Sequence, residues 1–132
     1  MDYKTFYSTI EKPFFAPEPW VFGFAWGIIY PLIAIAFIYT IYLASKKKLP
    51  WSLVGVFVIN LVANFAFTSL QLDFPNQLYA TLDIVLIVGT LAYLEWCFWK
   101  QSKVLFFLLL PYLLWGSFAT VLQTTIYVMN YL

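Results

Sequence analysis

The sequence predicts an all-α integral membrane protein, a bundle of four transmembrane helices that forms a single domain over residues 1–132. Of the 132 residues, 64% are hydrophobic and only 10% are charged, and the mean hydropathy is +0.85. A water-soluble domain with a charged surface does not show such values. Four stretches of the chain reach the roughly 20 apolar residues that a helix needs to cross a bilayer. Short connections separate them, as in a bundle of antiparallel neighbours.

The first element is a segment at residues 1–19 that we expect to form a lid. Its prolines and aromatic residues run directly into the first apolar stretch, in the sequence Pro13-Phe-Phe-Ala-Pro-Glu-Pro-Trp20. Residues 1–18 mix charges with aromatic side chains and lack the apolar core of a cleavable signal peptide. Membrane insertion is therefore expected to depend on the internal helices.

The four spanning helices are expected at about residues 20–44, 52–72, 78–99 and 104–131. The first and last carry no charge, the second carries amides and hydroxyls, and the third carries two carboxyl groups. Pro31 and Pro111 fall inside the first and last helices, where proline removes a backbone hydrogen bond and bends the helix. Such bends can open a cavity, although membrane helices also tolerate proline without one.

The lysines predict how the bundle is oriented. Five of the seven lie in the connections at residues 45–51 and 100–103, and the connection at 73–77 has none. Because lysine collects in cytoplasmic loops, these two connections are expected in the cytoplasm, with both chain termini on the opposite side.

The composition excludes several kinds of site. A net charge of +1 gives no electrostatic reason for nucleic-acid binding. The chain has no histidine and one cysteine, Cys97, and so lacks the usual metal and haem ligands and the usual catalytic triads. We therefore expect no metal site, no required cofactor and no nucleic-acid partner. A non-enzymatic role is favoured, although an enzyme is left open.

Polar side chains inside the helices are candidates for binding. Asn60 and Asn64 lie four residues apart and share a helix face, with Gln71 near the same face. These carboxamides must bond another helix or a ligand, and the pattern alone favours another helix. Asp83 is a functional candidate as an intramembrane carboxyl group, with an interhelical bond as the favoured alternative. Glu95, near a helix end, is expected to reach the interface in a structural role.

Six tryptophans are the next signal. Trp26 and Trp115 lie well inside their helices, where an indole needs a partner for its N–H group or a flat apolar ligand to stack on. Aromatic core packing is the alternative for both. The others fall at predicted helix ends and are typical of an interfacial belt: Trp20, Trp51, Trp96 and Trp99.

Several motifs follow one another along the chain: Phe6-Tyr7, Lys12-Pro13, Pro17-x-Pro19-Trp20-Val21-Phe22, Ala25-Trp26, Tyr30, Asn60-x-x-x-Asn64-x-x-Phe67, Asp83, Pro111-Tyr112-Leu113-x-Trp115-x-x-Phe118-Ala119-Thr120-x-Leu122 and Asn130. In these motifs the chain resembles, over nearly its whole length, the tryptophan-rich sensory protein family. That family includes the mitochondrial translocator protein, or peripheral benzodiazepine receptor.

The resemblance implies a cavity that binds flat hydrophobic molecules, chiefly porphyrins, with sterols and synthetic ligands in some members. The expected function is therefore a membrane receptor or sensor for a porphyrin-type tetrapyrrole. The implied lining residues are Trp26, Tyr30, Asn64, Phe67, Trp115 and Ala119. Tyr7 belongs to the implied lid, and Asn60 and Asp83 complete the candidate ligand-binding residues.

Family members have five spanning helices, and this sequence begins where the loop after their first helix would lie. A lipid, a second copy in a homo-oligomer or another chain is expected to cover that flank. One alternative function is thus a structural or interaction subunit completed by a partner helix. A weaker one is light-dependent porphyrin breakdown, with Trp26 and Trp115 as the catalytic residues. The expected location is a bacterial or archaeal plasma membrane, with an organelle membrane as the alternative.

Overall fold

The computed structural model describes residues 3–73 and 77–131, and every regular element within these ranges is a helix. Helix α1 spans Tyr3–Thr9, α2 Pro19–Ser45, α3 Trp51–Asp73, α4 Leu78–Gln101 and α5 Lys103–Tyr131. The last four are long and apolar enough to cross a membrane, which confirms the predicted fold class. Their ends lie within one or two residues of the expected positions. The predicted turn at residues 74–76 lies outside the described residues.

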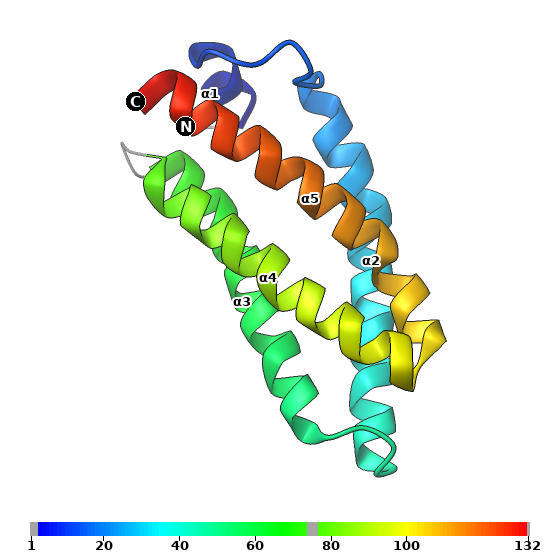
Figure 1. Cartoon of the computed structure of the whole chain (residues 1–132). Helices are drawn as coiled ribbons and strands as arrows, with labels where there is room; N and C mark the ends of the chain where they lie inside the picture. Colours follow the sequence, from blue (N-terminus) through cyan, green and yellow to red (C-terminus); the bar gives the residue numbers. More distant parts are fainter. Residues whose placement is uncertain (1–2, 74–76, 132) are drawn as a thin grey trace.

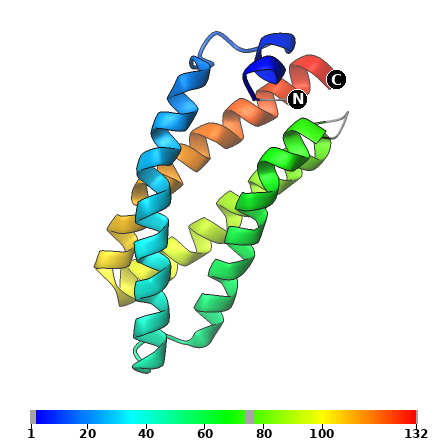
Figure 2. The ribbon, with the colours of Figure 1, turned by 180° about the vertical axis from the view of Figure 1, so that it is seen from behind.

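The long helices form a ring in which each contacts its sequence neighbours and α5 also contacts α2 (Figure 1). Viewed from behind, α2 and α3 meet at the connection between them and separate toward the other end (Figure 2). At that other end α1 lies beside the last turns of α5, close to where α2 begins. Helix α2 begins at Pro19 because proline suits the first helical turn, where no backbone donor is needed.

The buried core follows from one inward stripe on each helix. In α2 the buried residues Ile29, Ile33, Ala36 and Thr40 recur every three or four positions, which places them on one face. Large apolar side chains also face outward, among them Ile38 at 67% and Val62 at 64% exposed. A bilayer solvates such residues favourably, so the outward apolar surface fits a membrane protein.

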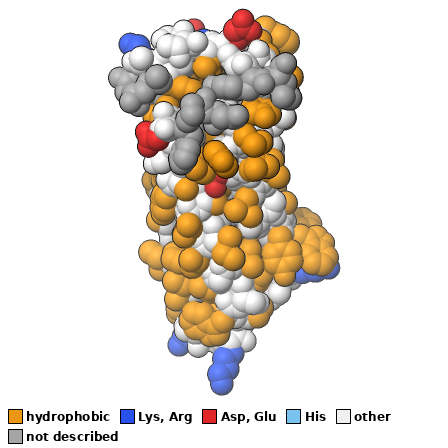
Figure 3. All heavy atoms as spheres, turned by 90° about the vertical axis from the view of Figure 1, so that its left-hand side faces the viewer, with side chains coloured by type: hydrophobic (Ala, Val, Ile, Leu, Met, Phe, Trp, Pro, Cys, Tyr) orange, Lys and Arg blue, Asp and Glu red, His pale blue; other side chains and the backbone are white. Residues whose placement is uncertain are grey.

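Charge is divided between the two ends of the bundle. Five of the seven lysines lie either in the connection after α2 or in the helix ends that flank the connection after α4, and both connections lie at the end opposite to α1. Figure 3 shows hydrophobic side chains along one face of the molecule and most of the lysines in view toward its lower end. The arrangement agrees with the predicted grouping of the two lysine-bearing connections on one side of the membrane.

Glu95 does not lie where the sequence placed it. It is only 2% exposed, and neither of its carboxyl oxygens has a hydrogen-bond partner among the described residues. Its position near the end of α4 suggested that it would reach the interface. However, Glu95 shares a helix face with Leu91 and Phe98, both 0% exposed, and that face turns inward. The helix face, rather than the distance from the helix end, decides the burial of this side chain.

The end of α2 contains a left-handed residue. Lys47 has φ of 61° and follows the C-cap Lys46. The Lys47 N–H donates to the Ala44 carbonyl at 3.0 Å and the Lys48 N–H donates to the Leu43 carbonyl at 2.9 Å. These two bonds are those of a Schellman motif, whose left-handed position usually holds glycine.

Replacing Lys47 with glycine should stabilise the protein by about 1 kcal/mol, because a Cβ atom in the left-handed region carries a steric cost that glycine avoids. Thermal unfolding in detergent measures the change. Lys48→Gly is the matched control, since it removes the same charge from a residue without positive φ. Equal effects of the two substitutions would contradict this explanation.

Candidate functional site

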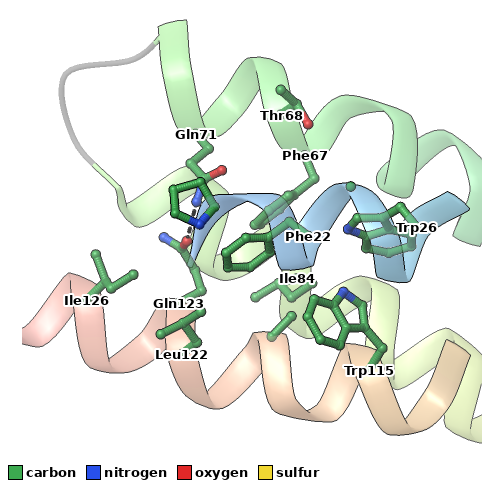
Figure 4. A pocket seen from close by; sticks show the side chains of 13 residues that line it. Phe22, Trp26, Phe67, Thr68, Gln71, Ile84, Trp115, Leu122, Gln123 and Ile126 are labelled. Carbon is green, nitrogen blue, oxygen red and sulfur yellow. Dashed lines mark hydrogen bonds between the residues drawn. The ribbon is translucent and has the colours of Figure 1, made fainter. Parts of the chain in front are cut away.

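A cavity of about 310 Å³ lies among the four long helices. Its walls come from the first turns of α2, the last turns of α3, one residue of α4 and the second half of α5, so it occupies the half of the bundle nearer to α1. Figure 4 shows most of these side chains from close by. The lining consists of Pro19, Phe22, Gly23, Trp26, Phe67, Thr68, Gln71, Ile84, Trp115, Ala119, Leu122, Gln123 and Ile126.

Helical spacing brings these residues together. The α2 residues lie at intervals of three and four positions, which makes one stripe along the helix. The α5 residues do the same over three turns, beginning at Trp115 and ending at Ile126. The two stripes face each other across the cavity, with Phe67 and Ile84 between them (Figure 4).

Aromatic side chains dominate one end of the cavity, where the indoles of Trp26 and Trp115 lie (Figure 4). The Phe22 ring packs edge-on against Trp115, with ring centres 5.7 Å apart. Trp26 stacks on Tyr30 at 5.0 Å and meets the Tyr112 ring edge-on at 6.1 Å. These contacts hold both indoles in place beside the cavity before any ligand arrives.

Two glutamines of the lining, Gln71 and Gln123, lie at the other end and bond to a third, Gln77, outside the lining. The Gln71 side-chain amide donates to Gln123 Oε1 at 2.9 Å, and the Gln123 amide donates to Gln77 Oε1 at 3.1 Å. The Gln77 amide donates to the Gln71 main-chain carbonyl at 2.7 Å. All three side chains are at most 3% exposed. The network fixes the orientation of the Gln71 carboxamide in the cavity wall.

Two polar atoms of the lining have no hydrogen-bond partner within residues 3–73 and 77–131. They are Gln71 Oε1, an acceptor, and Trp115 Nε1, a donor. They belong to opposite ends of the cavity (Figure 4). A buried unpaired polar group costs about 1–3 kcal/mol, and a ligand with a donor near Gln71 and an acceptor near Trp115 would remove that cost.

Three of the predicted site residues lie outside the lining, in a hydrogen-bond network between helices. The Tyr30 hydroxyl donates to Asn64 Oδ1 at 2.9 Å, and the Asn64 amide donates to the Tyr112 hydroxyl at 2.9 Å. The Tyr112 hydroxyl donates to Asn60 Oδ1 at 2.8 Å, and the Asn60 amide donates to the Ile87 carbonyl at 2.8 Å. This network links all four long helices directly beside Trp26.

The predicted site is therefore only partly brought together. Trp26, Phe67, Trp115 and Ala119 line the cavity. Asp83 precedes the lining residue Ile84 but is not itself in the lining, and its Oδ2 is buried without a partner among the described residues. Sequence reasoning missed the lining role of several residues that lie at helical spacing from the two tryptophans: Phe22, Gly23, Leu122, Gln123 and Ile126.

Tyr7 does not line the cavity but packs edge-on against its wall residue Phe22, with ring centres 5.5 Å apart. Its hydroxyl donates to the Pro17 carbonyl at 2.7 Å. Burial, helped by the nearby Glu18 charge, raises the pKa of Tyr7 to about 12, so the phenol is neutral at physiological pH. The Tyr7 contacts tie α1 to the segment that leads into Pro19.

The same segment is also fastened to α5. The Glu11 N–H donates to Asn130 Oδ1 at 2.9 Å, and the Asn130 amide donates to the Glu11 carbonyl at 2.9 Å. Farther along, the rings of Phe15 and Phe118 meet edge-on at 6.3 Å. Residues 3–18 therefore contact both α2 and α5 at the end of the bundle that contains the cavity.

Comparisons with known proteins identify a family and several relatives of this chain. Residues 1–129 match the sequence profile of the TspO/MBR family. The chain is 38% identical to the tryptophan-rich protein TspO of Bacillus cereus, over 96% of this chain and 82% of that protein. It is 34% identical to the tryptophan-rich protein TspO of Archaeoglobus fulgidus, over 96% and 81%. It is 27% identical to the human translocator protein, over 89% of this chain and 70% of the human protein.

Proposed function

The chain belongs to the TspO/MBR family of membrane proteins, and we propose that it is a receptor or sensor whose cavity binds a flat hydrophobic ligand, a porphyrin-type tetrapyrrole. One observation carries the proposal: a cavity inside the bundle has indoles on two facing helices and an otherwise largely apolar lining. Apolar cavities with a few converging polar groups are typical small-molecule sites. Bacterial and archaeal relatives fit a plasma-membrane location.

The lining residues provide both affinity and orientation. Apolar ligand surface buried against them contributes about 25 cal/mol per Å² before the costs of binding. The free Gln71 oxygen and Trp115 N–H group would fix which edge of the ligand faces each end of the cavity. No acidic, basic or cysteine side chain occurs in the described lining. Its residues therefore supply a binding surface rather than acid–base catalysis.

The cavity is small for a tetrapyrrole, so ligand binding is expected to move residues 3–18. A volume of 310 Å³ is near the lower limit of small-molecule sites, which run from about 300 to 1,000 Å³. A tetrapyrrole would therefore need additional space. The segment before Pro19 is held by a few hydrogen bonds and ring contacts, one of them from Tyr7 to the lining residue Phe22, and we expect its displacement to make room for the ligand.

Protoporphyrin should bind saturably, and the double substitution Trp26→Phe with Trp115→Phe should weaken binding by roughly 30-fold. Each substitution removes aromatic area and a donor, and roughly 1 kcal/mol for each indole gives this factor. Binding is measured by the shift of the porphyrin absorption band, because the substitutions remove fluorescent reporters.

The control is Trp51→Phe with Trp96→Phe, which makes the same chemical change at indoles that are 56% and 61% exposed. This control should bind as tightly as the parent protein. Unsaturable association that neither double substitution alters would show that the porphyrin partitions into the micelle instead of binding the cavity.

A further inference from the structure

A groove lies between α2 and α5, away from the tetrapyrrole cavity. It has a volume of about 440 Å³ and is lined by Leu32 of α2 and by Lys103, Val104, Phe107 and Leu108 of α5. Four of these side chains are apolar, and the single charged one, Lys103, is the first residue of α5. The groove therefore combines one cation with an otherwise hydrocarbon-like wall.

The Lys103 ammonium group has a defined position. Its Nζ lies 3.0 Å from the centre of the Trp99 ring, a cation–π contact at the end of α4. Trp99 in turn meets the Phe106 ring edge-on at 4.9 Å. Trp99 is 48% exposed. The lysine is thus held near the interface but can still donate hydrogen bonds to an anion.

Charges around the groove favour an anionic ligand. Five lysines lie in the α2–α3 connection or at the adjoining ends of α4 and α5, at this end of the bundle. The nearest described carboxyl group in the sequence, Glu95, is only 2% exposed. Positive residues beside a bilayer attract anionic headgroups. Charge complementarity therefore indicates a phosphate-bearing partner.

The apolar side chains that line the groove indicate that this partner is a lipid. Val104, Phe107 and Leu108 follow Lys103 within about 8 Å along the axis of α5, at 1.5 Å per residue. They follow Lys103 into the apolar span of α5, and Val104 and Phe107 are each 58% exposed on its outer surface. We propose that the groove holds one anionic phospholipid, with its phosphate at Lys103 and an acyl chain against Leu32, Phe107 and Leu108.

The test uses the full chain in a neutral detergent, titrated with phosphatidylglycerol or with phosphatidylcholine of the same acyl chains. Native mass spectrometry counts the lipids retained. One phosphatidylglycerol should be retained in preference to phosphatidylcholine. Lys103→Gln should reduce the preference about fivefold, the factor that corresponds to about 1 kcal/mol per lysine near an anionic surface. Lys103→Arg should preserve it.

One control and one further variant separate a site from general surface charge. Lys100→Gln removes the same charge at the same end, but the Lys100 ammonium lies over the Trp96 ring at 4.2 Å and does not line the groove. It should leave the preference nearly unchanged. Val104→Trp should fill the groove and displace the lipid without a change of charge.

Three results would overturn the proposal. They are equal losses for Lys100→Gln and Lys103→Gln, competition by inorganic phosphate alone, and a lipid-free dimer in place of the lipid complex. The tetrapyrrole cavity is lined by other residues, so porphyrin binding should be the same in all of these variants. The two proposals can therefore fail separately.

Discussion

Replacing Gly23 with leucine should reduce ligand affinity strongly while the fold stays intact. Gly23 lies in the α2 stripe that lines the cavity, between Phe22 and Trp26. A Cβ atom added there meets no heavy atom within 4 Å, so the first atom of a side chain is accommodated without a clash. The leucine would occupy space that the ligand needs. Overpacking costs about 1–3 kcal/mol, which corresponds to a loss of roughly 5- to 150-fold in affinity.

Affinity for protoporphyrin measured beside thermal stability checks this expectation. The matched controls are Gly55→Leu in α3 and Gly89→Leu in α4, where an added Cβ atom also meets nothing within 4 Å. Both positions are exposed and lie outside the cavity. Unchanged affinity in Gly23→Leu, or an equal loss in the controls, would place the ligand elsewhere.

Replacing Tyr112 with phenylalanine should destabilise the bundle by about 1–3 kcal/mol. The Tyr112 hydroxyl accepts a bond from Asn64 and donates one to Asn60, and the side chain is 1% exposed. Its removal leaves two buried amide groups without those partners. Unpaired buried groups cost about 1–3 kcal/mol each in general. Hydrogen bonds between membrane helices contribute less, about 0.6 kcal/mol on average, which sets the lower end of the estimate.

Unfolding by a denaturing detergent measures the loss. Tyr39→Phe is the control, because the Tyr39 ring stacks on Tyr42 at 6.1 Å but its hydroxyl has no hydrogen bond among the described residues. It should change stability by less than about 0.5 kcal/mol, because the substitution keeps the ring and removes no hydrogen bond. If both substitutions had the same small effect, the network would not be a main source of helix association.

The indoles and the amides singled out in the sequence have different positions in the structure. Trp26 and Trp115 stood out because an indole inside a membrane span needs either a partner or a ligand, and both line the cavity. Asn60 and Asn64 met the same physical requirement by bonding to other helices. Gln71 lies near the same face of the helix but borders the cavity. Residue type and spacing could not separate these outcomes, because a hydrogen bond to another helix and a hydrogen bond to a ligand each satisfy a buried carboxamide.

The glutamine cluster shows a second limit. Gln71, Gln77 and Gln123 come from three separate parts of the chain and meet only when α3 and α5 pack together beside the start of α4. Pairwise spacing within one helix carries no information on such a contact. The sequence does offer one signal for Gln123, because this polar residue of α5 lies at helical spacing from Trp115.

The sequence by itself determined that this protein is an all-helical membrane bundle, since apolar stretches of spanning length must satisfy their backbone groups as helices in lipid. It also determined the helix ends to within one or two residues and the grouping of most lysines at one end. Only the tertiary structure decided which face of each helix turns inward. That choice buried Glu95, committed Asn60 and Asn64 to the helix network, and left Gln71 and Trp115 with unpaired atoms beside a cavity. The physical reason is that burial depends on contacts between helices, which a spacing pattern within one helix does not specify.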